Sequence, residues 1–320
     1  MSSPHPDLLL RVERTARLAA DVHLFELRDA AGGDLPAFTA GAHIGLHVPN
    51  GTLRKYSLCN DPAERHRYEI AVKREAAGHG GSCSLVDGLR AGDTIAAARP
   101  HNSFELVEGA GEILFIAGGI GVTPILSMVR HLQTTGRTRY HLYYLCRSEE
   151  STAFGDELRT HPFGEHVTIH HDSGDPALAF DLWPILEKAS KAHVYCCGPR
   201  PLLEAVRDMT GHWPGARVHF ESFIDAAAAQ TPADRAFTVR LAQSGESIEV
   251  PPGVSILEAL RAHGCEVPSS CESGTCGTCK TRLIRGEADH RDLVLGDDEK
   301  SEFIMVCVSR ARSGEIVIDR

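Results

Sequence analysis

Apolar and polar side chains alternate over much of the first third of the chain. Within residues 8–100, the alternation is clear at 44–48 and at 68–72, where every second side chain is apolar. A period of two predicts half-buried antiparallel strands, and turn residues such as those at 49–51 separate them. This segment is therefore expected to fold as a small antiparallel β-barrel.

The pattern changes between residues 109 and 224. A continuous apolar run at 113–117 is typical of a buried parallel strand, and it leads through a glycine-rich turn into an amphipathic helix. Thr123 is expected to cap this helix and Pro124 to occupy its first position. Strand patterns then alternate with helical ones, which predicts a parallel sheet covered on both faces. The further strands are expected at 140–146, 167–171, 193–197 and 218–220.

A third pattern follows a stretch without large apolar residues at 225–235, which we interpret as a linker. Residues 236–320 open with a hairpin pattern whose turn lies at 244–245. A capping box at 255–258 predicts the start of a helix, and Gly264 is expected to end it.

Four cysteines near the C-terminus have the spacing C-x4-C-x2-C, followed after a long gap by a fourth: Cys271, Cys276, Cys279 and Cys307. This is the plant-type pattern for the thiolate ligands of a [2Fe–2S] cluster. Apart from Glu272, the loop between them is built from small residues, which lets backbone N–H groups approach the sulfur atoms. A structural zinc site is the alternative, but such sites usually show two short pairs of ligands, and only Cys276 and Cys279 form one. The spacing therefore predicts an iron–sulfur cluster.

These patterns together predict three domains, which suits a chain of 320 residues with 42% hydrophobic residues. They are an antiparallel β-barrel (1–108), an α/β parallel-sheet domain (109–224) and, after the linker at 225–235, a C-terminal α+β domain of the plant-type ferredoxin kind (236–320).

Charge and composition narrow the possible partners. The net charge of −10 argues against binding to nucleic acid. Residues 1–17 show no signal-peptide pattern, and the longest apolar run, 113–126, is too short and glycine-rich to span a membrane. We therefore expect a soluble, cytoplasmic protein with neither a nucleic-acid nor a membrane partner. The six other cysteines show no disulfide framework, and most are expected to be free and buried: Cys59, Cys83, Cys146, Cys196, Cys197 and Cys265.

Two short motifs in the barrel segment suit a flavin. Arg54, Tyr56 and Ser57 combine a guanidinium, an aromatic ring and a hydroxyl, so that the ring can pack on an isoalloxazine and Arg54 can pair with a phosphate. The glycine-rich residues 78–82 offer successive backbone N–H groups that can cradle a phosphate. A surface arginine beside a half-buried tyrosine, and a flexible hairpin loop, are the alternatives.

The glycine-rich turn at 118–124 lies where a helix N-terminus favours an anionic pyrophosphate. It lacks the six-residue Rossmann fingerprint, and tight strand–helix packing without a ligand is the alternative. Cys197 ends another strand at the same expected sheet edge, where it could lie beside a nicotinamide ring or simply form a buried pair with Cys196. Asp172, at a further strand end, could bind an adenosine ribose hydroxyl and favour NADH, whereas Arg147 could meet a 2′-phosphate.

Two further clusters have competing interpretations. The cluster of His166, His170, His171 and Asp172 is interpreted as a solvated strand end rather than a metal site, because strand geometry puts only His166 and His170 on one face. The acidic run at 297–299, with Glu302, precedes the fourth cysteine. It is interpreted as a solvated helix face, with a docking surface as the alternative.

Together these motifs resemble the phthalate dioxygenase reductase family of class IA oxygenase reductases, in the same domain order and over essentially the whole chain. The matching stretches are residues 54–61, 71–74, 80–82, 118–124, 194–199, 206–214, 219–223 and the cysteine loop at 271–279. The resemblance implies that NADH delivers electrons through FMN to the [2Fe–2S] cluster, and on to a separate Rieske-type non-haem iron oxygenase, with phthalate dioxygenase as the first expectation. One departure concerns an FMN phosphate contact, because family members often carry Arg where this chain has His79.

The resemblance also implies the residues of each site, with no catalytic residue beyond the cofactors. FMN would be held by Arg54, Tyr56, Ser57, Ala71, Val72, Lys73, Gly80, Gly81, Ser82, Thr123 and Phe223. NADH would be held by Gly118, Gly119, Ile120, Gly121, Val122, Thr123, Pro124, Asp172, Cys197, Gly198 and Pro199. The cluster would be held by the four cysteines named above.

Two alternatives to this function are kept. One is the reductase of another Rieske system, such as a vanillate-type aromatic O-demethylase, and the other is an iron–sulfur redox sensor. A Rieske centre needs two His ligands beside two Cys ligands, and the chain contains no C-x-H motif. Oxygenation is therefore expected on a separate partner.

Overall fold

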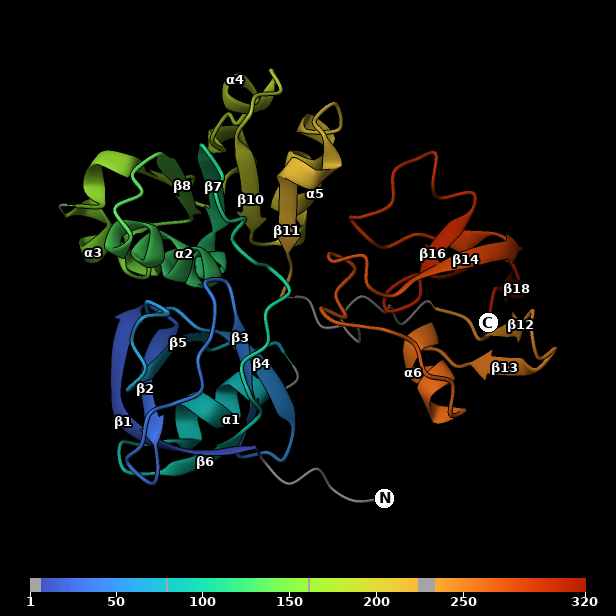
Figure 1. The fold of residues 1–320 in the computed structure, drawn as a ribbon, viewed down its shortest axis with the longest axis horizontal. Helices are drawn as coiled ribbons and strands as arrows, with labels where there is room; N and C mark the ends of the chain where they lie inside the picture. The colour runs from blue at the N-terminus through green and yellow to red at the C-terminus, as the bar shows by residue number, and fades with distance from the viewer. Residues whose placement is uncertain (1–6, 79, 161, 224–233) are drawn as a thin grey trace. The chain divides into compact units, whose positions relative to one another are not determined.

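The structure is a computed structural model that describes residues 7–78, 80–160, 162–223 and 234–320. The chain divides into two compact units. One comprises Met1–Pro199 with Asp208–His219, and the other Arg200–Arg207 with Phe220–Arg320. Figure 1 shows the elements of both.

The first sheet of the first unit is an antiparallel six-stranded sheet in the order β4-β3-β6-β1-β2-β5. Its strands are β1 (Leu8–Ala19), β2 (Val22–Asp29), β3 (His43–His47), β4 (Leu53–Ser57), β5 (Tyr68–Lys73) and β6 (Thr94–Ala97). A bridge between Leu58 and Ile70 joins the two edge strands, so the sheet closes on itself. Alternate side chains fill its interior, as the period of two requires. The prediction of an antiparallel barrel is confirmed.

The second sheet of this unit has the order β11-β10-β7-β8-β9, and β10, β7, β8 and β9 run parallel. Its strands are β7 (Ile113–Gly118), β8 (Tyr140–Cys146), β9 (Val167–His171), β10 (His193–Cys197) and β11 (Val218–Glu221), and the helices of the unit are α2 (Val122–Thr134), α3 (Gly155–Arg159) and α4 (Trp183–Leu186). The residues of β11 and of α5 (Arg200–Met209) are divided between the two units. The strand order reverses between β7 and β10. In parallel sheets, ligands bind beyond the carboxyl ends of the strands at this point.

The start of α2 differs from its prediction. A 3-10 turn at Gly119–Gly121 leads directly into the helix, which begins at Val122. Thr123 is therefore inside the first turn rather than at the cap, and Pro124 follows it. The Thr123 hydroxyl donates to the backbone oxygen of Ile120 at 2.9 Å. The expectation was wrong because the 3-10 turn already carries the helical backbone past the cap position.

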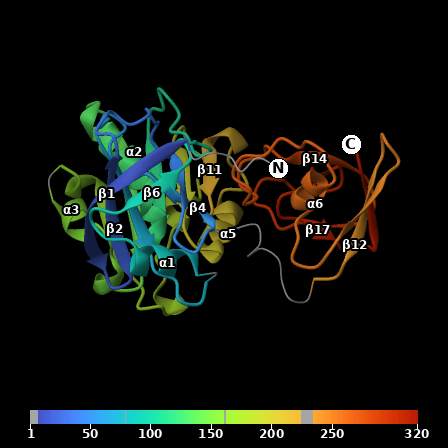
Figure 2. The same ribbon diagram turned by 90° about the horizontal axis from the view of Figure 1, so that it is seen from below.

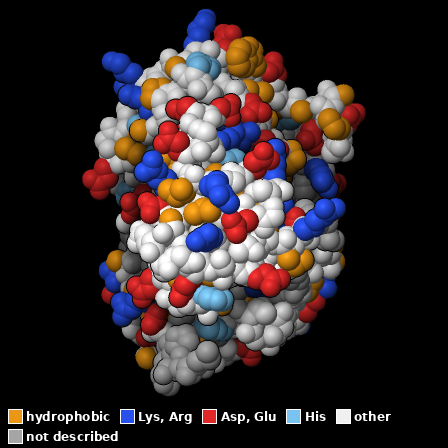
Figure 3. All heavy atoms as spheres, turned by 90° about the vertical axis from the view of Figure 1, so that its right-hand side faces the viewer, with side chains coloured by type: hydrophobic (Ala, Val, Ile, Leu, Met, Phe, Trp, Pro, Cys, Tyr) orange, Lys and Arg blue, Asp and Glu red, His pale blue; other side chains and the backbone are white. Residues whose placement is uncertain are grey.

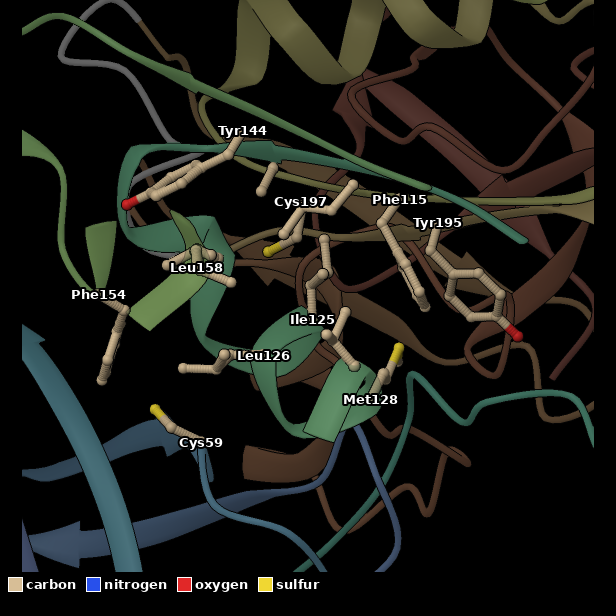
Figure 4. Close-up of a cluster of buried hydrophobic side chains, with 14 of the residues drawn as sticks. Cys59, Phe115, Ile125, Leu126, Met128, Tyr144, Phe154, Leu158, Tyr195 and Cys197 are labelled. Atoms are coloured by element: carbon tan, nitrogen blue, oxygen red, sulfur yellow. The ribbon is translucent and has the colours of Figure 1, made fainter. Parts of the chain in front are cut away.

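Helix α2 lies between the parallel sheet and the barrel (Figure 1). Cys59 and Ala71 of the barrel belong to the same buried cluster as Phe115 of β7 and Leu126 of α2. Figure 4 shows the Cys59 side chain below those of Leu126 and Phe154. The barrel therefore shares one apolar cluster with the parallel sheet, with α2 between them, whereas the barrel interior forms a separate cluster.

The second unit contains a five-stranded mixed sheet in the order β13-β12-β18-β14-β16. Its strands are β12 (Phe237–Leu241), β13 (Ser247–Val250), β14 (Lys280–Arg285), β16 (Phe303–Met305) and β18 (Glu315–Ile318), with a small second sheet of β15 (Ala288–Asp289) and β17 (Arg310–Ala311). Figure 2 shows helix α6 (Ile256–Ala262) beside these strands. The capping box of Ser255 and Glu258 is confirmed, and Gly264 follows the helix with a φ of +79°.

Asp234, the first described residue before β12, carries a buried carboxylate. Asp234 is paired with Arg291 at 2.7 Å and lies 3.6 Å from Arg310. The Arg310 side chain is 2% exposed and also donates to the backbone oxygen of Arg235. Of the predicted linker, residues 225–233 lie outside the described residues.

The three-domain fold class is confirmed, whereas the domain boundaries stay predictions, because the barrel and the parallel sheet share one compact unit. Within the described ranges, no helix is long and apolar enough to cross a membrane. All ten cysteines carry free thiols, and Cys59, Cys146, Cys196 and Cys197 are buried.

The capping box yields a stability prediction. Ser255 Oγ accepts a hydrogen bond from the Glu258 N–H at 3.1 Å, and the Glu258 carboxylate accepts one from the Ser255 N–H at 2.8 Å. Ser255→Ala should lower the free energy of unfolding of this unit by about 0.5–2 kcal/mol. Urea denaturation followed by the visible absorbance of the cluster measures this. Ser247→Ala, at an exposed position of β13, is the control, and equal midpoints for the two variants would contradict the prediction.

Candidate cofactor sites

The four cysteines of the second unit form two pairs. Within each pair one thiol affects the other: Cys276 lowers the pKa of Cys271, and Cys307 lowers the pKa of Cys279. Backbone N–H groups of the loop act in the same direction on the pKa of Cys271. One of these N–H groups, that of Ser273, lies 3.4 Å from the Cys271 sulfur. Thiolates in pairs are what a two-iron cluster requires, since four thiolates are shared between two irons.

A buried carboxylate that the sequence analysis missed supports the cysteine loop. Asp292 accepts hydrogen bonds from the N–H groups of Val294 at 3.1 Å and Leu295 at 2.8 Å. The next residue, Leu293, donates its N–H to the backbone oxygen of Gly274 at 2.9 Å. Bonds from an aspartate to N–H groups two and three residues later are a local turn pattern, and that pattern is the signal that could have identified Asp292.

No other residue fits at Gly274. Its φ is +75°, and a Cβ there would lie 2.7 Å from a Val308 methyl and 3.1 Å from the Asp292 Cα. Gly277, in the same loop, has a φ of +82°, but a Cβ there would make only an ordinary van der Waals contact, with a Val294 methyl at 3.5 Å. The loop therefore requires glycine at 274 for its packing and at both positions for its backbone.

The flavin candidates on the barrel gather around the N-terminus of helix α1 (Gly81–Gly88). Gly80 is its left-handed cap residue, with a φ of +79°. A Cβ on Gly81 would lie 2.8 Å from the Arg54 Nε, so the arginine side chain crosses directly over the glycine. The backbone N–H groups of a helix start and a guanidinium therefore converge there, which fits a phosphate. The Ser82 hydroxyl accepts the Glu75 N–H at 3.0 Å and shapes this turn.

At the other end of the flavin candidates lies a hydroxyl group without a hydrogen-bond partner. Ser57 Oγ is buried and has no hydrogen-bond partner in the described protein, which fits a bound group that supplies one. Burial raises the pKa of its neighbour Tyr56 to about 12, so this phenol stays protonated. The bridge from Leu58 to Ile70 brings this strand end beside Ala71–Lys73 on the barrel edge.

The nicotinamide candidates meet at the carboxyl ends of β7 and β10. A Cβ on Gly121 would lie 2.2 Å from the backbone oxygen of Cys197 and 2.8 Å from the N of Gly198, so only glycine permits this approach. The 3-10 turn Gly119–Gly121 also contacts β5 of the barrel. The structure thus brings the turn at 118–124 together with Cys197–Pro199, close to the flavin candidates.

Asp172 follows β9 at the same edge of the sheet. Its carboxylate accepts the Gly174 N–H at 2.7 Å, and its own N–H donates to Cys146 at 3.2 Å. The N–H of Ser173 donates to the backbone oxygen of Arg147 at 2.8 Å, so the two candidates for contacts with the adenosine ribose lie side by side. Cys196 is fully buried, and burial raises the pKa of its thiol strongly.

Some predicted site residues are not joined to these groups. Phe223 is 45% exposed and belongs to the second unit, so its relation to the flavin candidates is not defined. His79 lies outside the described residues. His170 bonds the backbone oxygen of Leu178 at 2.7 Å, whereas His171 bonds Thr152 at 2.9 Å. Among the described residues, no three His, Cys, Asp or Glu side chains form a site for a single metal ion.

The acidic run at 297–299 is not on a helix. The segment is a turn between loops, so the expectation of a helix face was wrong. Lys300 pairs with Asp297 at 2.7 Å, and Lys280 pairs with Glu299. Figure 3 likewise shows acidic and basic side chains interspersed on the face it presents.

Comparisons with known proteins agree with this arrangement. Three family models match in succession: an oxidoreductase FAD-binding domain at residues 9–106, an oxidoreductase NAD-binding domain at 115–208 and a 2Fe-2S iron-sulfur cluster binding domain at 239–312. The chain is 53% identical to phthalate dioxygenase reductase of Burkholderia cepacia, over all of both chains. It is 39% identical to vanillate O-demethylase oxidoreductase of Pseudomonas sp. (strain HR199 / DSM 7063), over 94% of this chain and 96% of the relative.

The fold is also similar to a solved structure of phthalate dioxygenase reductase, which is described as a modular structure for electron transfer from pyridine nucleotides to [2Fe–2S]. The match covers 98% of each chain, with a TM-score of 0.73 and 53% sequence identity. The protein is therefore an iron–sulfur flavoprotein oxidoreductase, in which electrons pass from NADH through a flavin, FMN in this family, to the cluster. More particularly, the chain belongs to the phthalate dioxygenase reductase family.

The close approach at Gly121 predicts a loss of NADH affinity. Gly121→Ala would force the turn away from Cys197, at a cost of about 1–3 kcal/mol, so the Kd for NADH should rise about 5- to 150-fold. Flavin and cluster should stay bound. Titration of the oxidised protein with NAD analogues measures the Kd. Gly215→Ala, where no atom lies within 4 Å of the added Cβ, is the control. An unchanged Kd in Gly121→Ala would overturn the prediction.

The cysteine loop gives a matched pair of variants. Gly274→Ala and Gly277→Ala share the strain of a positive φ, but only the first adds a clash. We expect Gly274→Ala to lose most of its cluster, with an excess destabilisation of about 1–3 kcal/mol, while Gly277→Ala keeps more. Cluster absorbance and iron content per protein measure this. Equal cluster contents would show that packing at position 274 is unimportant.

Proposed function

We propose that this chain is the reductase component of a Rieske-type aromatic-ring dioxygenase, and that the oxygenase it serves is phthalate dioxygenase. The observation that carries the proposal is the 53% identity over the full length of phthalate dioxygenase reductase, against 39% for the vanillate O-demethylase relative. The relatives are named as reductases of oxygenase systems, and this chain has no C-x-H motif of a Rieske centre of its own.

For the flavin we propose a site on the barrel. Arg54 and the N–H groups after Gly80 would bind the phosphate, and Ser57 would donate to the ring system. When bound, a flavin converts a two-electron donor into one-electron steps. The full proposed set is Arg54, Tyr56, Ser57, Ala71, Val72, Lys73, Gly80, Gly81, Ser82, Thr123 and Phe223.

For NADH we propose the carboxyl edge of the parallel sheet. The N-terminus of α2 would face the pyrophosphate, and Asp172 would accept hydrogen bonds from the adenosine ribose, which favours NADH over NADPH. The full proposed set is Gly118–Pro124, Asp172 and Cys197–Pro199. Cys271, Cys276, Cys279 and Cys307 would ligate the cluster.

The proposal includes a cytoplasmic location, which is supported by the finding that none of the ten cysteines, all within the described residues, is in a disulfide. The vanillate-type reductase remains the second candidate, because that relative covers nearly the whole chain. A redox sensor is disfavoured, since a sensor has no need of a nicotinamide site and a flavin site.

Reconstitution tests the choice of oxygenase. With NADH, the chain should support product formation by the phthalate dioxygenase oxygenase at least about tenfold faster than by the vanillate O-demethylase oxygenase, a difference of about 1.4 kcal/mol. Reduction of an artificial acceptor confirms that the reductase is active in both assays. Cys307→Ser, which lacks a cluster ligand, is the negative control. Faster turnover with the vanillate enzyme would replace the proposal by its alternative, and turnover with neither would refute both.

A further inference from the structure

Helix α2 connects the two candidate sites of the first unit. Its N-terminus continues the 3-10 turn Gly119–Gly121, which packs against β5 of the barrel. Further along, Ser127 Oγ donates to the backbone oxygen of Asn60 at 2.8 Å, and the Thr134 hydroxyl donates to the Asp61 carboxylate. Seven residues separate Ser127 from Thr134, which is about two turns. One face of α2 is therefore bonded to the segment that directly follows β4.

Arg130 lies on this face between the two hydroxyls and binds three partners at once. Its Nη1 donates to the backbone oxygen of Cys59 at 3.0 Å and to the Glu69 carboxylate at 2.9 Å. Its Nε and Nη2 donate to the two carboxylate oxygens of Glu157 at 2.9 and 2.7 Å. The partners come from the end of β4, from β5 and from α3. A single guanidinium thus joins the barrel to the parallel-sheet part of the unit.

The ion pair between Arg130 and Glu69 is largely buried, so it can hold α2 at a fixed position on the barrel. The side chain of Arg130 is 17% exposed and that of Glu69 is 6% exposed. Burial acts to lower the pKa of Arg130, but the hydrogen bond and charge of Glu157 and the charge of Glu69 outweigh it. The guanidinium therefore stays charged. The second oxygen of Glu69 accepts from Arg67 at 2.8 Å, so both sides of this carboxylate are held.

We propose that Arg130 is a positioning residue for hydride transfer: by bonding Glu69, Cys59 and Glu157, it sets the distance between the nicotinamide site at the start of α2 and the flavin site on β4 and β5. Glu69 is two residues before Ala71 on the flavin edge, and Cys59 is two residues after Ser57. A shift of α2 along the barrel would therefore displace one site relative to the other. The inference rests on the two sites proposed above and not on the identity of the oxygenase.

The step concerned is sensitive to distance. A C–H bond of the reduced nicotinamide breaks, and its hydrogen passes with both bonding electrons to the flavin, so that one partner is oxidised and the other reduced by two electrons. A misplacement of about 1 Å can cost such a reaction about 100-fold in rate. Loss of positioning lowers the rate at saturation and leaves substrate affinity nearly intact, whereas loss of a binding contact raises KM.

The first test is Arg130→Lys in the flavin- and cluster-containing protein. Lysine keeps the charge but cannot reach three partners with a planar fork of donors. Stopped-flow reduction at saturating NADH should slow by up to about 100-fold, while the Kd for NADH stays within about threefold, less than half the free energy of a tenfold change. The long-wavelength charge-transfer absorbance between nicotinamide and flavin, which reports ring contact rather than turnover, should weaken.

A second variant covers the case in which Arg130→Lys fails to fold. Glu157→Gln removes one charge and leaves an acceptor, so it should show the same pattern with a smaller loss. The matched control is Arg159→Lys, in an exposed pair with Glu149 at 2.6 Å on the same part of the unit. This control should reduce the flavin at the normal rate with a normal charge-transfer band.

The possible results distinguish a failure of the positioning role of Arg130 from a failure of the proposed binding sites. A normal rate and band in Arg130→Lys, or in Glu157→Gln if the lysine variant is unstable, would overturn the positioning role. So would a raised Kd at a normal rate. Failure of the underlying site assignment has a different signature, because it would leave the Kd for NADH unchanged in Gly121→Ala. No oxygenase takes part in these measurements.

Discussion

The attachment of helix α2 to two neighbours is the constraint on which the first unit depends. One side of the helix is apolar and lies in a core shared by both sheets, and the other side carries Ser127, Arg130 and Thr134 against the barrel. Breaking a buried ion pair by removing one partner costs about 3–5 kcal/mol, so the charged side of this contact resists sliding. The two proposed binding sites, on different sheets, thereby belong to one compact unit.

The second unit uses a different means to hold its cofactor. The cysteine loop has few side chains large enough to pack, so its shape is fixed by backbone hydrogen bonds and by a glycine at a crowded position. Asp292 organises the neighbouring turn, and that turn bonds Gly274. Backbone N–H groups directed at Cys271 also favour the thiolate, because they stabilise its charge. The ligand chemistry and the loop conformation are therefore consequences of the same small residues.

Local patterns predicted most of the fold and much of the candidate sites. The strands at 113–117 and 193–197 were recognisable because a buried parallel strand is a short apolar run, and the capping box at 255–258 because it is a contact within four residues. The prediction that Thr123 caps α2 was wrong because hydrophobic periodicity does not reveal the 3-10 turn that precedes the helix. Arg130 was missed for another reason. Its partners Glu69 and Glu157 are 61 and 27 residues away, and a charged residue on a helix otherwise indicates only a solvated face.

The buried ion pairs of Asp234 with Arg291 and Arg310 decide where the iron–sulfur domain can be cut from the rest of the chain. Composition placed the start of that domain at residue 236, yet Asp234 and the carbonyl of Arg235 already serve two arginines inside it. A fragment cut at 236 would remove these two partners of Arg310, whose guanidinium also donates to the carbonyls of Val254 and Pro251. A fragment meant to fold alone should therefore start before β12 and include Asp234. If this domain is fused to another reductase, Asp234 must be kept as the counter-ion of its two arginines.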